Sequence, residues 1–242
     1  KYRDGSDPDN YPNVNHLKWL LESGSGFQHQ HNLSIQGGNA TTSYNLSVGY
    51  RNQEGMTAKT SNERMTALFT MKSEIAKGLM LNLNINAYNN KYKAPNGEPQ
   101  SIDGMIGYAV RQGPIYAGQK SDGSFGYQDN YSPEAWLASE SFVQNVSRNI
   151  SASGQLTWNT PVDGLSYIYK EGKNYSTKND KAYRSDTNID ESKTVGPATL
   201  NVWTANNTYT TFEALATYEK QIKNHTFKLL AGTSVEQSNN IG

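Results

Sequence analysis

The segment HNLSIQGGNATTSYNLSVGYRNQEG, at residues 31–55, alternates apolar and polar side chains on both sides of a Gly-Gly pair. Successive side chains of a β-strand point to opposite faces, so this period of two predicts two strands. In the second strand, one face carries Tyr44, Leu46, Val48 and Tyr50, and the other carries Ser, Asn and Gly. Because the GGNAT stretch between the strands suits a tight turn, the segment predicts an antiparallel hairpin with one apolar and one polar face.

Eight segments of the chain alternate in this way and predict eight strands. They lie at residues 27–36, 43–50, 62–73, 79–87, 146–158, 164–176, 207–219 and 225–236. Most span about 9 to 13 residues, whereas a strand of a globular protein usually has about 5 to 6 and a strand that crosses a bilayer at a tilt needs about 9 to 11. The length of the strands therefore favours a membrane-spanning sheet.

Short and long connections alternate between these strands. Tight turns are predicted at 37–41, 74–78, 160–164 and 220–224, and longer connections at 53–61, about 91–144 and about 177–206. Outer-membrane barrels have short turns at one end and long loops at the other, which a β-sandwich has no reason to do. We therefore predict an all-β fold of antiparallel up-and-down hairpins that form part of an outer-membrane β-barrel, with apolar side chains toward lipid and Asn, Ser and Thr toward an aqueous lumen.

The long connections are predicted to contain short helices. Residues 101–114 place Ile102, Ile106 and Ala109 at helical spacing, and Ser132 followed by Pro133 is typical of a helix start. A third helix is expected at 14–23.

Composition excludes several classes of protein. Lys plus Arg and Asp plus Glu both number 22, so the chain has no net positive charge to attract nucleic acid. Cysteine is absent, which excludes disulfides and thiol nucleophiles. The chain begins KYRDGSDPDN, without an initiator Met or a signal-peptide pattern, and is expected to be a piece of a longer protein.

The order of motifs resembles a known family. HLKWLLESG is followed by HNLSIQGGNATTSYNLSVGYRNQEG and then by NERMTALF, and the region 114–125 contains Pro-Ile-Tyr and Asp-Gly-Ser-Phe. This combination is similar to the SusC/RagA type of TonB-dependent outer-membrane transporters of Bacteroidota, over essentially the whole chain and most densely over 14–90.

The resemblance implies a barrel of about 22 strands, the size typical of outer-membrane transporters with a plugged lumen. It also implies an N-terminal plug, a TonB box for energy coupling and a SusD-like surface lipoprotein as a lid. We find neither plug nor TonB box in this chain, so residues 1–242 are expected to be a contiguous segment of the barrel. The implied function is uptake of oligosaccharides or peptides across the bacterial outer membrane.

Aromatic residues are the main candidates for function. Rings with polar edges suit both sugar or peptide binding and the boundary between lipid and water. The candidates for ligand binding, for which loop packing, lid contact or girdle placement are the alternatives, are Tyr108, Tyr116, Phe125, Tyr127, Tyr131 and Trp136 in the long connection, and Trp203 at the end of the other. The candidates for an aromatic girdle are Tyr44, Tyr50, Tyr88, Trp158 and Tyr218.

No enzyme, cofactor or metal site is predicted. His29 and His31 share a strand face, but the further ligands that zinc needs are missing from their surroundings. The catalytic patterns GxSxG, SxxK and HExxH are absent from the sequence. Two alternatives remain open: a self-contained eight-stranded outer-membrane barrel with a structural or adhesive role, and a soluble, secreted, glycan-binding β-sandwich.

Overall fold

A computed structural model describes residues 1–2, 4–96, 102–129 and 132–242. Its main sheet has eight strands, all of them at the segments predicted from the alternation. They are β1 (Gln28–Gly38), β2 (Thr42–Glu54), β3 (Ser61–Ala76), β4 (Leu79–Pro95), β5 (Phe142–Asn159), β6 (Leu165–Arg184), β9 (Thr199–Ile222) and β10 (His225–Ile241). A small hairpin of β7 (Thr187–Asp190) and β8 (Lys193–Val195) lies between β6 and β9 in the chain.

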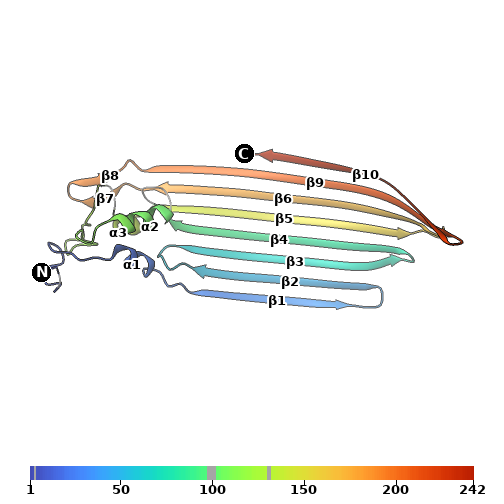
Figure 1. The fold of residues 1–242 in the computed structure, drawn as a ribbon, viewed down its shortest axis with the longest axis horizontal. Coiled ribbons are helices and arrows are strands. Elements are labelled where there is room, and N and C mark those ends of the chain that lie inside the picture. Colours follow the sequence, from blue (N-terminus) through green and yellow to red (C-terminus); the bar gives the residue numbers. More distant parts are fainter. Residues whose placement is uncertain (3, 97–101, 130–131) are drawn as a thin grey trace.

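The main sheet is a meander in which each strand pairs with its neighbour in the chain, apart from the β7–β8 insertion. All seven pairs of neighbouring strands are antiparallel. The tight turns lie at one end of the sheet, and the longer connections lie at the other end with the helices (Figure 1). The predicted up-and-down topology and the alternation of short and long connections are therefore confirmed.

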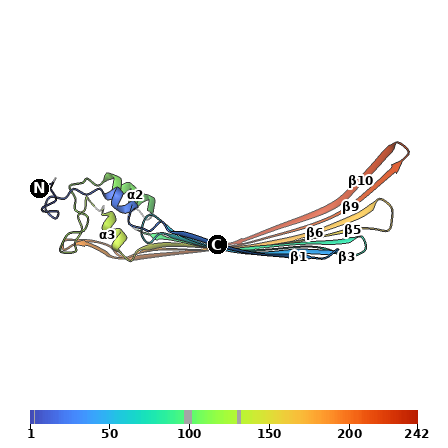
Figure 2. The same cartoon turned by 90° about the horizontal axis from the view of Figure 1, so that it is seen from below.

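The sheet is a single layer. Figure 2 shows it nearly edge-on, twisting along its length, with the helices gathered beyond one end. Apolar side chains in mid-strand are correspondingly uncovered: Leu33 is 61% and Leu229 is 69% exposed. Among the described residues no second sheet packs on this one, which contradicts the sandwich alternative. Because β1 and β10 are edges that do not pair with each other, the sheet is also not the closed eight-stranded barrel.

Strands β6 and β9 are longer than predicted, and this corrects the connection expected at 177–206. The two strands stay paired up to Arg184 and Thr199, so the connection is only 185–198 and contains β7 and β8. The alternation of apolar and polar residues fades beyond residue 176, where Thr, Asn, Lys and Asp follow one another. A strand with two polar faces has the same backbone pairing but no hydrophobic period, so the sequence pattern missed it.

The buried core lies in the helices and not in the sheet. The three predicted helices are present as α1 (His16–Leu21), α2 (Ile102–Arg111) and α3 (Pro133–Ala138). Their fully or nearly fully buried apolar side chains form one cluster: Leu20, Met105, Ala109, Trp136 and Leu137. No helix in the described part of the chain is long and apolar enough to cross a membrane.

Candidate functional site

The register of the sheet brings the apolar side chains of all eight strands onto one face. Residues paired across antiparallel strands share a face, and Leu33, Val48, Ala67 and Ala87 are joined in this way from β1 to β4. The same pairing joins Ile150 of β5 to the row. We call this side of the sheet the apolar face and the opposite side, rich in Asn, Ser and Thr, the polar face.

The apolar residues form a band that crosses the strands obliquely. On β2 the band runs from Tyr44 to Tyr50, and on β9 it runs from Tyr218 to Phe212. The pairing aligns Tyr50 of β2 with Asn206 of β9, and Tyr44 with Phe212. On β9, however, the band ends at Phe212 and Tyr218, which are each six residues closer to the tight turns than these aligned positions. A flat apolar layer produces such an offset only when the strands are tilted against it.

The size of the offset gives the tilt. Six residues at about 3.4 Å each are about 20 Å along a strand, and the five strand spacings from β2 to β9, at about 4.8 Å each, are about 24 Å. These two lengths correspond to a tilt of about 40°, and strands of closed barrels tilt by about 35–45°. The apolar band therefore has the geometry of a barrel wall that crosses a flat hydrophobic layer.

Aromatic side chains mark the borders of this band. Of the girdle candidates, Tyr44, Trp158 and Tyr218 lie at the border near the tight turns, and Tyr50 lies at the other. Sequence reasoning missed Tyr167, whose ring stacks on Trp158 with centroids 5.9 Å apart. The sequence could have indicated Tyr167, because it lies two residues from both Leu165 and Tyr169 and therefore shares a strand face with them.

Tyr88 lies on the polar face, unlike the other four girdle candidates. Its position in β4 is even-numbered, and the apolar residues of that strand, Leu79 to Ala87, are odd-numbered. The guanidinium of Arg64 lies 5.3 Å from the centre of the Tyr88 ring on the same face. We therefore leave Tyr88 out of the girdle.

The polar face is hollowed near the level of Tyr44. The hollow has a volume of about 1040 Å³, and polar side chains of all eight strands of the main sheet line it, among them Asn45, Asn84 and Gln155. Lys170 and Glu213 also line it, with Nζ and Oε1 3.2 Å apart. The hollow is open and hydrophilic, as expected for a surface that faces an aqueous bore.

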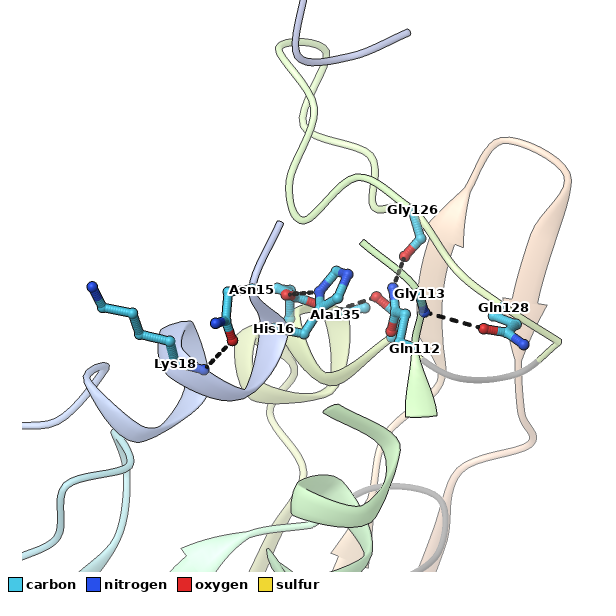
Figure 3. Close-up of polar contacts among 10 residues, drawn as sticks. Asn15, His16, Lys18, Gln112, Gly113, Gly126, Gln128 and Ala135 are labelled. Atoms are coloured by element: carbon cyan, nitrogen blue, oxygen red, sulfur yellow. Dashed lines mark hydrogen bonds and ion pairs between the residues drawn. The ribbon is translucent and has the colours of Figure 1, made fainter. Parts of the chain in front are cut away.

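The loop cluster, by which we mean α1, α2, α3 and the connections around them, is joined by a buried polar contact. His16 Nδ1 of α1 lies 2.6 Å from Glu134 Oε1 of α3, and both side chains are almost fully buried. Figure 3 shows the His16 ring beside Ala135 at the start of α3. Asn15 caps α1 by accepting a hydrogen bond from the backbone N–H of Lys18.

Further hydrogen bonds join segments that are distant in the sequence. The backbone N–H of Val14 donates to Pro114 O at 3.0 Å, and that of Phe125 donates to Ile189 O in β7 at 2.8 Å. Lys59, in the connection between β2 and β3, donates through Nζ to Ser139 O at 2.7 Å. Partial burial is the main cause that lowers the pKa of Lys59. These bonds make the long connections one ordered body at one end of the sheet.

The loop cluster places the ligand-binding candidates at different depths. Trp136 is fully buried in its core, so its ring presents no surface to a ligand in this conformation. Tyr108, Tyr116, Phe125 and Tyr127 are half-buried. Tyr131 lies outside the described residues. No ring contact joins any two of the described candidates.

Trp203 was expected at the end of a loop and instead lies within β9, paired with Asp180 of β6. Trp203 lies inside the strand because β9 begins at Thr199 and not at residue 207, where the sequence pattern placed its start. Its odd-numbered position puts it on the polar face, on the side of the long connections, with 63% of its surface exposed. Trp203 is exposed, whereas the other described candidates for ligand binding are half-buried or buried.

Serine residues form hydrogen bonds to two carboxylates in the long connections, Asp122 and Asp190. Ser124 donates through both N–H and Oγ to Asp122, and Ser192 does the same to Asp190. Hydrogen bonds from Ser124 and Ser192 lower the pKa of the respective carboxyl groups. Both residues therefore stay ionised at neutral pH and keep the tips of the two loops polar.

Comparison with known proteins supports the barrel-wall geometry. No family model matches the sequence, and no curated protein matches it. Among solved structures, the RagAB peptide transporter superposes with a TM-score of 0.68 at 19% identity, over 96% of this chain and 27% of that chain. RagAB described as a peptide importer in the "open-open" state gives a TM-score of 0.60 at 19% identity, over 87% and 25%.

A second kind of transporter has the same fold. The ferric-catecholate import receptor Fiu of E. coli K12, in its open form, superposes with a TM-score of 0.52 at 13% identity, over 90% of this chain and 33% of that chain. The chain thus spans about a quarter to a third of these proteins. The chain therefore shares its fold with a part of each of these proteins.

Proposed function

We propose that residues 1–242 form a contiguous part of the barrel wall of a TonB-dependent importer in a bacterial outer membrane. The oblique apolar band on an uncovered sheet face is the observation that carries this proposal. Lipid hydrocarbon is the partner that would cover such a face without a second protein layer. The polar face and its hollow would then border the lumen, and the loop cluster would lie on the outside of the cell.

The substrate class we propose is oligosaccharides or peptides. Peptides are the first to test, because RagAB is described as a peptide transporter. We propose that the accessible ring of Trp203 and the half-buried rings of the loop cluster contact this substrate, and that a SusD-like lipoprotein covers it from outside. In this proposal the chain supplies wall and loops, in keeping with the similar structures, which are a transporter and a receptor.

Uptake by cells tests the function. The whole protein that carries this chain would be expressed in a host outer membrane, and the entry of fluorescent oligopeptides and oligosaccharides would be followed with and without functional TonB. We expect the protein in the outer-membrane fraction and uptake of one of the two substrate classes only when TonB is present. Uptake that continues without TonB, or a protein found in the soluble fraction, would contradict the proposal.

A further inference from the structure

Three cations lie on the apolar face just outside the apolar band. Lys91 is on β4, Arg148 on β5 and Lys173 on β6, which are adjacent strands (Figure 1), and all three side chains are exposed. In the strand pairing, Arg148 is level with Asn89 of β4 and Thr177 of β6. Relative to Arg148, Lys91 therefore lies two residues nearer to the long connections, and Lys173 lies four residues nearer to the tight turns. The three cations therefore descend toward the tight turns from β4 to β6.

The cations lie along the border of the apolar band on the side of the long connections. Lys91 lies four residues beyond Ala87, the last apolar residue of the band on β4, and Arg148 lies two residues beyond Ile150 on β5. The border drops by about one residue per strand, given the tilt derived above, whereas the three cations drop by six residues from β4 to β6, so Lys173 lies nearer to the band than Lys91 and Arg148 do. All three cations thus lie at or beyond the border where the hydrophobic layer ends on the side of the long connections, with Lys91 the furthest from the band.

The charges of this group are unpaired. In the part of the chain that the structure describes, no hydrogen bond or ion pair engages the side chain of Lys91, Arg148 or Lys173. The neighbouring Glu171 carboxylate accepts a hydrogen bond from the Tyr169 hydroxyl at 3.0 Å instead. The whole chain has no net charge, so this local group of cations is not a result of an overall excess.

The group also has clear lateral limits. Beyond β4, the apolar-face positions paired in register with Lys91 are Glu63 on β3 and Asn52 on β2, and beyond β6 the position paired with Lys173 is Thr210 on β9. On the side of the long connections, the cations beside the border of the band are therefore confined to three neighbouring strands. We call Lys91, Arg148 and Lys173 the basic step.

We propose that the basic step binds the phosphate groups of lipid headgroups in the outer leaflet. This proposal rests on the proposed function, because it requires the apolar band to lie in the membrane. Lys and Arg keep their aliphatic stems along apolar surface and extend their charged ends to the headgroups. A guanidinium binds phosphate in a bidentate manner, and a flanking ammonium on each side adds attraction to an anionic surface.

The test measures lipid retained by the whole protein. It would be purified in detergent and incubated with a mixture of phosphatidylcholine and phosphorylated lipid A, or with the same mixture after phosphatase treatment of the lipid A, and retained lipid would be counted by native mass spectrometry. We expect enrichment of phosphorylated lipid A that is lost after phosphatase treatment. The K91Q/R148Q/K173Q variant should lose the enrichment by about 100-fold, since each cation near an anionic surface contributes about fivefold.

A matched variant removes three cations from the polar face: K72Q/K178Q/K228Q. It makes the same change in charge, and we expect its lipid A enrichment to equal that of the unmodified protein. Equal enrichment in the basic-step variant, or enrichment that survives phosphatase treatment, would overturn this proposal alone. A whole protein that neither retains lipid nor enters phosphatidylcholine nanodiscs would instead overturn the proposed membrane wall. A change in oligomeric state of the basic-step variant without a change in lipid retention would assign the surface to a second copy of the protein.

Discussion

Among single side chains, the contact between His16 and Glu134 does most to hold the loop cluster together. It joins α1 to α3 across 118 residues of sequence, with both partners almost fully buried. A buried group that loses its charged or hydrogen-bonded partner is left without compensation, which typically costs about 3–5 kcal/mol. The contact is therefore the point at which the folding of the loops is most vulnerable to one substitution.

Substitution of Glu134 by Ala tests this role. We expect Glu134→Ala to lower the local stability of the loop cluster by about 3–5 kcal/mol, seen as faster amide hydrogen exchange in α1 and α3 of the whole protein. Exchange in the sheet should not change, because its hydrogen bonds are independent of the cluster. Glu191→Gln, at an exposed loop carboxylate, is the control and should leave all exchange rates unchanged. Unchanged exchange in α1 after Glu134→Ala would show that the contact is dispensable.

Trp158 reports on the depth of the girdle. It lies 44% exposed on the apolar face near the tight turns, stacked on Tyr167. In a variant of the whole protein whose other tryptophans are replaced by Phe, we expect brominated lipids in nanodiscs to quench its fluorescence strongly. A matched variant that keeps only Trp136, which is buried in the loop cluster, should be quenched little. Equal quenching of the two would mean that the border of the band is not at the membrane.

Among structural elements, the tight turns fix the register on which the single apolar face depends. A shift by one residue would move every apolar side chain of a strand to the polar face. At Gly164, before β6, φ is +83° and an added Cβ would overlap the carbonyl oxygen of Glu219. The backbone N–H of Glu219 also donates to Gly164 O at 2.8 Å, which links this turn to β9.

Gly164→Ala should therefore destabilise the sheet. The left-handed backbone conformation and the overlap together should cost about 1–3 kcal/mol, measured as a lower unfolding temperature of the whole protein in detergent by its mobility on gels. Gly107→Ala, in α2 where an added Cβ meets open space, is the control. It should be neutral or stabilise the helix by up to about 1 kcal/mol. Equal unfolding temperatures for the two variants would contradict the importance of this turn.

The sequence predicts best the strands that have one polar face and one apolar face. All eight strands were predictable from alternation, but β4 and β6 were predicted too short because both their faces are polar near the long connections, and β9 was also predicted too short although it begins with Leu200 and Val202. Aromatic residues near strand ends predicted four positions at the borders of the apolar band, whereas Tyr88 has the opposite parity and lies on the polar face. The burial of Trp136 was not predictable, since it depends on packing between α1, α2 and α3, which no local pattern encodes.

In the molecule as a whole, β1 and β10 are open edges with unpaired backbone groups. Such edges pair with any available strand, so we expect the 242-residue chain produced alone to self-associate. Light scattering after removal of denaturant should show large assemblies, and the whole protein refolded in detergent should remain monodisperse by the same measurement. A monomeric, detergent-free solution of the isolated chain would contradict the assignment of both edges and the apolar face.

The alternation of environments along one strand tests the central claim most directly. The chain has no native cysteine, so a spin label can be attached at single positions from 80 to 87 of β4 in a cysteine-free form of the whole protein in nanodiscs. We predict that odd-numbered positions collide mainly with oxygen, which dissolves in lipid, and even-numbered positions mainly with a water-soluble nickel complex. The same preference at odd and even positions, or the reversed one, would show that the apolar face does not meet the membrane.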